Sequence, residues 1–170
     1  MKMLCTLFMT AGLVCAAQAQ ASASEETAFL KSLEGNWAGS GTVKPRIGSA
    51  PIGVRCSFET RENADALSMQ GTCRGMILIS RSIGADIKVD GTRYSGVYIG
   101  PAGGRSALSG SRQGEAINLA IRWANEVNGD RNANLTVERV GSTGMVLKTV
   151  DTDPASGEAV VTSEINLQRR

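Results

Sequence analysis

Apolar and polar residues alternate along most of the chain after residue 36. The clearest run is 117–123, in which every second position is apolar: Ile117, Leu119, Ile121 and Trp123. Residues 52–61 alternate in the same way. A period of two is typical of a β-strand that buries one face. We therefore predict strands throughout this part of the chain, with no pattern of helical length after residue 34.

Short turn signals separate the predicted strands. Asp90-Gly91 and Asn128-Gly129 are dipeptides that favour two-residue hairpins. The runs add up to about nine or ten short strands in an up-and-down order. A sheet of this length must curl to cover its edges, which favours a closed barrel over a sandwich. The sequence therefore predicts an all-β fold, an antiparallel up-and-down β-barrel of about eight to ten strands.

One segment ahead of the barrel has helical rather than strand spacing. Residues 24–33 begin at Ser24, a candidate N-cap, and Gly35 follows their end. The apolar residues of this segment form a single stripe: Phe29, Leu30 and Leu33. We expect a short helix that plugs one open end of the barrel.

Residues 1–19 have the pattern of a secretory signal peptide. Lys2 precedes an apolar run over residues 3–16, and Ala17-Gln18-Ala19 supplies an Ala-x-Ala cleavage site. We therefore expect export to the periplasm, a leader and short helix over residues 20–34, and a single barrel domain over residues 35–170. The apolar run is too short to cross a bilayer, and no second run predicts a membrane span.

Removing the signal peptide leaves two cysteines, Cys56 and Cys73. Folding the flanking runs about residues 63–66 places Cys56 opposite Cys73 and Phe58 opposite Gly71. Both cysteines then lie on the apolar face of one hairpin, at a spacing that suits a cross-strand disulfide. Because oxidising compartments form and keep such bonds, we predict a structural disulfide.

The sequence lacks the residues that several kinds of catalysis and metal binding require. The chain contains no histidine, which excludes Ser-His-Asp and Cys-His catalysis, the usual catalytic zinc sites and histidine-ligated haem. Its acidic residues fall mainly on outward positions or in loops, which indicates solvated surface charge. With a net charge of +2 and no basic block, nothing indicates nucleic-acid binding. We expect no enzymatic activity, no metal and no cofactor.

The inward positions of the predicted strands are mainly apolar and include two phenolic hydroxyls. Two interpretations stay open: a filled core, or a cavity for a small apolar or amphipathic ligand. Glycines among these positions, such as Gly71 and Gly96, would leave space for a ligand. On the cavity interpretation the ligand-binding residues are Trp37, Phe58, Met69, Ile87, Tyr94, Tyr98, Ile121 and Trp123.

Gly35-x-Trp37, at the start of the first strand and just after a short helix, resembles the entry motif of lipocalins and related calycin barrels. In that superfamily a basic residue near the end of the last strand packs across the tryptophan and closes the barrel. Arg169 has the parity for this role. The resemblance implies a small apolar or lipidic ligand bound in the barrel mouth, without catalysis.

The chain also resembles secreted inhibitors of bacterial metalloproteases, which are small periplasmic barrels with an early tryptophan and a disulfide between neighbouring strands. Their N-terminal segment enters the protease cleft, and residues 20–30 correspond to it here. Two functions follow. The first is a monomeric, non-enzymatic periplasmic barrel for a small apolar ligand. The alternative is a protein-binding module of the cell envelope, either a protease inhibitor or a scaffold with a filled core.

Overall fold

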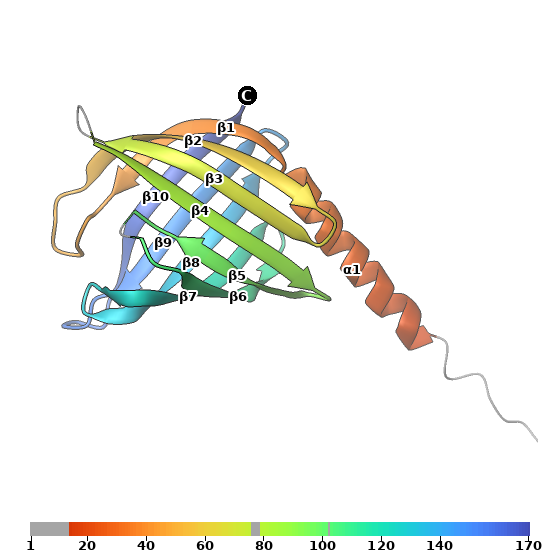
Figure 1. Ribbon diagram of the computed structural model, residues 1–170. Helices are drawn as coiled ribbons and strands as arrows, with labels where there is room; N and C mark the ends of the chain where they lie inside the picture. The colour runs from red at the N-terminus through yellow and green to blue at the C-terminus, as the bar shows by residue number, and fades with distance from the viewer. Residues whose placement is uncertain (1–13, 76–78, 102) are drawn as a thin grey trace, which may run out of the picture.

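The computed structural model describes residues 14–75, 79–101 and 103–170. Within these residues the chain forms one helix and ten strands (Figure 1). Their bounds are α1 Val14–Ser32, β1 Gly35–Val43, β2 Ile52–Asn63, β3 Ala66–Gly75, β4 Ile79–Asp90, β5 Arg93–Ile99, β6 Ser106–Gln113, β7 Ala116–Val127, β8 Asp130–Val140, β9 Gly144–Thr152 and β10 Ala159–Arg169.

The strands close into an antiparallel up-and-down barrel. Each strand pairs with its neighbours in sequence, and β1 also pairs with β10 to complete the ring. The predicted fold class is therefore confirmed. The turns follow the predicted chemistry, because Asn128 and Gly129 both have positive φ, as a tight hairpin turn requires. No helix in the described part of the chain is long and apolar enough to cross a membrane.

The hairpin of β2 and β3 has the predicted register. Cys56 pairs with Cys73 and Phe58 with Gly71 along the ladder. The two cysteines are joined in a disulfide with their Cα atoms 4.1 Å apart, and both are buried. A shift of one residue would have turned this whole apolar face outward, so the burial pattern and the disulfide specify the same register.

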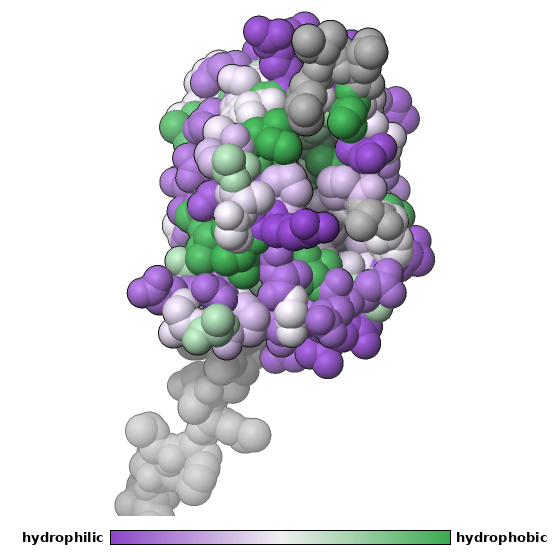
Figure 2. Space-filling view, turned by 90° about the vertical axis from the view of Figure 1, so that its left-hand side faces the viewer, coloured by the Kyte–Doolittle hydropathy of each residue, from purple (hydrophilic) through white to green (hydrophobic). Residues whose placement is uncertain are grey.

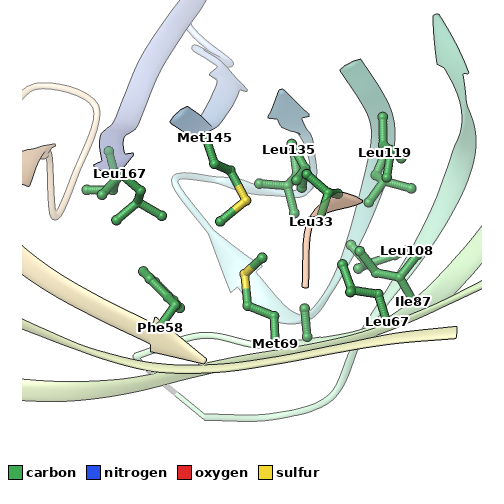
Figure 3. Packing of buried hydrophobic residues seen from close by; sticks show 14 of the residues in the cluster. Leu33, Phe58, Leu67, Met69, Ile87, Leu108, Leu119, Leu135, Met145 and Leu167 are labelled. Carbon is green, nitrogen blue, oxygen red and sulfur yellow. The ribbon is translucent and has the colours of Figure 1, made fainter. Parts of the chain in front are cut away.

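The middle of the barrel is filled by apolar side chains. In Figure 3, Met69 and Met145 extend toward one another from opposite walls, and Leu33 enters between the strands from the end of the helical segment. Phe58, Ile87 and Ile121 belong to the same buried cluster. Six of the eight predicted ligand-binding residues therefore lie in packed core: Trp37, Phe58, Met69, Ile87, Tyr94 and Ile121.

The inward glycines do not leave the expected space. A Cβ atom at Gly71 would lie 2.1 Å from Cδ1 of Phe58, and one at Gly96 would lie 2.1 Å from the backbone oxygen of Asp86. These glycines accommodate a ring and a neighbouring strand, so they allow tight coiling of the sheet rather than a cavity.

The start of the helix differs from the prediction. Helix α1 begins at Val14, so Ser24 lies inside it and is not its N-cap. Residues 16–23 are rich in alanine, the strongest helix former, which explains the extension. Strand β7 continues to Val127, directly before the Asn128-Gly129 turn, and β9 continues to Thr152. Residues 1–13 of the predicted signal peptide lie outside the described residues.

Candidate functional site

The two ends of the barrel differ. Helix α1 contacts β2, β3 and β4 at one end, which we call the closed end. The opposite end, which we call the open end, carries the connections between β1 and β2, β7 and β8, and β9 and β10 (Figure 1). Figure 2 looks onto the open end, where hydrophobic residues are visible between hydrophilic ones around the mouth.

At the closed end, Trp37 and Arg169 lie in contact. The guanidinium of Arg169 stands 4.3 Å from the centroid of the Trp37 rings. The same guanidinium donates hydrogen bonds to the carbonyls of Ser32, at 2.7 Å, and Glu34. The Trp37 indole donates to the Leu33 carbonyl and to Thr60 Oγ1, each at 3.0 Å. Both residues thus hold the end of the helical segment against the barrel.

An ion pair fixes the helix farther along. Glu26 is 6% exposed and accepts hydrogen bonds from the Tyr94 hydroxyl at 2.6 Å and from Arg112 Nε at 2.7 Å. Burial opposes ionisation of Glu26, but the hydrogen bonds from Arg112 and Tyr94 outweigh it and hold its pKa below the usual value. Burial, reinforced by the Glu26 carboxylate, raises the pKa of Tyr94. Tyr94, predicted to face a ligand, is instead a partner of α1.

Sequence reasoning missed Glu26 and Arg112. The acidic residues were interpreted as solvated surface charge, but Glu26 is buried. Arg112 could have indicated this contact, because it shares the inward parity of Leu108 and Gly110 on β6. A buried arginine requires a carboxylate partner.

The other two predicted ligand-binding residues meet at the open end. The rings of Tyr98 on β5 and Trp123 on β7 stand 5.9 Å apart between centroids, edge to face at 62°. Ser106 on β6 lies between them, since it pairs with Tyr98 and accepts a hydrogen bond from the Ala124 amide at 3.1 Å. Burial raises the pKa of Tyr98 to about 12. The buried Trp123 Nε1 has no hydrogen-bond partner among the described residues.

Asp151, near the end of β9, is the second feature that sequence reasoning missed. The acidic residues were interpreted as solvated surface charge, but Asp151 is only 4% exposed. Thr162 donates a hydrogen bond to Oδ2 of Asp151, while Oδ1 has no partner among the described residues. The β9–β10 register shifts between Val161 and Ser163, and this irregularity brings Thr162 inward. The parity that Asp151 shares with Met145 and Leu147 could have indicated its inward position.

A hollow of about 670 Å³ lies among the loops of the open end. It is lined by residues 45–48, 126–128 and 153–154. The Asn128 side chain accepts a hydrogen bond from the Ile47 amide at 3.2 Å and so ties two of these segments together. The lining segments follow Trp123 on β7 and Asp151 on β9. The hollow opens widely to solvent, and its lining does not include Tyr98, Trp123 or Asp151.

The fold has a known structural relative. The chain is similar to Rv2717c from M. tuberculosis, whose crystal structure superposes with a TM-score of 0.63 at 16% sequence identity. The match covers 83% of this chain and 94% of Rv2717c. No protein-family model and no curated protein sequence matches the chain. At this identity the likeness shows a shared barrel fold.

Proposed function

We propose that this protein binds a small apolar or amphipathic molecule at the open end of its barrel, without catalysing a reaction. The observation that carries the proposal is the Tyr98–Trp123 pair, whose indole N–H is buried and unpaired within the described chain. An aromatic surface with a few unused polar groups is the usual lining of a small-molecule site. A hollow lies at the same end of the barrel, lined by residues 45–48, 126–128 and 153–154 rather than by Tyr98 or Trp123.

The closed end supports a calycin-like interpretation. A basic residue across the entry tryptophan is what the resemblance implies for lipocalins, and Arg169 stands over Trp37 in this way. Because α1 and these two residues occupy the closed end, we expect a ligand to enter at the open end. The shared fold with Rv2717c fits a barrel of this general kind.

We also propose that the protein is exported to the periplasm. The supporting features are the signal-peptide pattern of residues 1–19 and the disulfide between Cys56 and Cys73. Such bonds persist in oxidising compartments and are rare in the cytosol.

The protease-inhibitor alternative gains no support from the N-terminal segment. Within residues 20–30, Glu26, Phe29 and Leu30 are buried against the protein's own barrel. An inhibitor acting through this segment would first have to withdraw these side chains from the closed end. A scaffold with a filled core remains the competing function that the binding experiment must separate.

The test is a titration of the mature protein with N-phenyl-1-naphthylamine, a neutral apolar probe that fluoresces when shielded from water. We expect saturable binding, weakened about tenfold or more in Tyr98→Ala and Trp123→Ala. Ile99→Ala is the matched control, because Ile99 follows Tyr98 but is 38% exposed. Absence of probe binding, together with a ligand-free mass for protein purified from its host, would reject the proposal in favour of the scaffold.

A further inference from the structure

Two buried polar atoms toward the open end lack partners within the described chain, and they are chemically complementary. Nε1 of Trp123 can only donate a hydrogen bond, whereas Oδ1 of an ionised Asp151 can only accept one. Native proteins leave few buried polar groups unpaired, and each exception calls for a physical reason. The protein's own side chains supply no reason here, since Thr162 occupies only the other oxygen of Asp151.

Both residues lie on the inner face of the barrel wall, on two strands that are separated by a third. Trp123 lies on β7 and Asp151 on β9, with β8 between them. The inward residue of β8 beside Asp151 is Ala133, which pairs with Ile121 and precedes Asn134, the partner of Val150. Ala133 is buried and has the smallest possible side chain after glycine. On β8 the inward position beside Asp151 therefore carries little side-chain volume, and Trp123 lies two residues farther toward the open end than Ile121.

We propose that Asp151 receives the polar end of the ligand, and that this end carries a hydrogen-bond donor, as a hydroxyl or a protonated amine does. This inference rests on the proposed function and names its ligand class. A hydroxyl can donate to Asp151, and its oxygen can still accept a hydrogen bond from a donor such as the Trp123 indole. A protonated amine gains a charge-assisted hydrogen bond to the carboxylate. A fatty acid offers a second anion, which the buried Asp151 carboxylate repels.

The proposal therefore predicts a selectivity opposite to that of a fatty-acid carrier. Tyr98 and Trp123 can make apolar contacts with any alkyl chain. Amphiphiles that have the same alkyl chain therefore gain the same affinity from these contacts. Discrimination arises at Asp151, where a missing donor leaves a buried carboxylate oxygen unpaired. Sites that reject a ligand by leaving their own polar groups unpaired achieve larger discrimination than apolar pockets do.

The experiment displaces N-phenyl-1-naphthylamine from the wild-type protein at neutral pH with decanol, decylamine and decanoate, which share one alkyl chain. We expect decanol and decylamine to displace the probe at concentrations about tenfold lower than decanoate. In Asp151→Asn the preference for decylamine over decanoate should disappear. The matched control is Glu158→Gln, which removes an exposed carboxylate from the same end and should leave the preference unchanged.

Each outcome decides between the two proposals. If the three amphiphiles displace the probe equally, or if a folded Asp151→Asn keeps the wild-type preference, the role of Asp151 is overturned while ligand binding stands. If the probe itself never binds, the proposed function fails and this inference fails with it. Should Asp151→Asn not fold, the order of displacement in the wild-type protein still decides the question alone.

Discussion

Arg112 on β6 and Glu26 on α1 form an ion pair at the closed end, with Nε of Arg112 2.7 Å from Oε2 of Glu26. A second contact joins Nη2 of Arg112 to Oε1 at 2.9 Å, so the guanidinium and carboxylate meet side by side. Arg112 also stands 4.8 Å from the centre of the Phe29 ring, one turn farther along the helix. Together these contacts fix both the position and the rotation of α1 on the barrel.

Replacing Glu26 by glutamine should lower the free energy of unfolding by about 2 kcal/mol, because it leaves Arg112 partly buried without a counter-charge. Urea denaturation followed by far-ultraviolet circular dichroism measures the change. The control is Glu115→Gln, which breaks the exposed pair with Arg139 and should change the midpoint little. Equal effects of the two variants would contradict a special role for the Glu26 contact.

The same pair predicts how stability depends on pH. The pKa of Glu26 is lower in the folded protein than in the unfolded chain. Its contribution is therefore complete above the usual glutamate range and is lost as the pH falls through the lower, folded pKa. Melting temperatures measured from pH 6 down to about pH 3 should fall more steeply for the wild-type protein than for Glu26→Gln. Parallel curves would show that Glu26 does not contribute to acid sensitivity.

Much of the barrel could be predicted because the sequence features that determine its strands and turns lie close together in the chain. The alternation in residues 52–61 and 117–123 determines which side chains face inward, and the turn at Asn128-Gly129 fixes where one hairpin reverses. The pairing of Cys56 with Cys73 follows from one such hairpin. These features depend on residues close together in sequence.

The polar contacts were not predictable in the same way. Glu26 and Arg112 lie 86 residues apart, and only the closed barrel brings them together. The sequence at Asp151 is typical of a loop, because aspartate is common in turns and Asp151 begins the sequence Asp-Thr-Asp-Pro, whose last two residues follow β9. Its hydrogen bond from Thr162 depends on the irregular β9–β10 register, which has no simple sequence signature.

The disulfide should contribute about 3 kcal/mol to stability, since it joins residues 17 positions apart and restricts the unfolded chain. The double variant Cys56→Ala/Cys73→Ala tests this in urea denaturation, compared with the oxidised wild-type protein. Denatured, unreduced mature protein should also contain no titratable thiol. Free thiols in that sample would show that the bond does not form in the purified protein.

Gly71 should tolerate no side chain while Phe58 stands opposite. A Cβ atom there would meet the phenyl ring at 2.1 Å, so Gly71→Ala should cost about 1–3 kcal/mol. In a Phe58→Leu background the smaller side chain relieves the clash, and the cost of Gly71→Ala should shrink. Gly53→Ala on β2 is the control, because its Cβ would meet no atom within 4 Å. Purely additive costs in the Gly71–Phe58 cycle would argue against this clash.

The contact between Arg169 and Trp37 should require a guanidinium rather than any positive charge. The planar group covers the indole at 4.3 Å and reaches the carbonyls of Ser32 and Glu34 at once, which the single ammonium of lysine cannot reproduce. Arg169→Lys should therefore lower stability by about 1–2 kcal/mol and speed amide hydrogen exchange in residues 30–37. Arg170→Lys, one residue farther along and exposed, should leave that exchange at the wild-type rate. If Arg169→Lys protects residues 30–37 as well as the wild-type protein does, then charge alone holds the helix end and the stacked geometry is incidental.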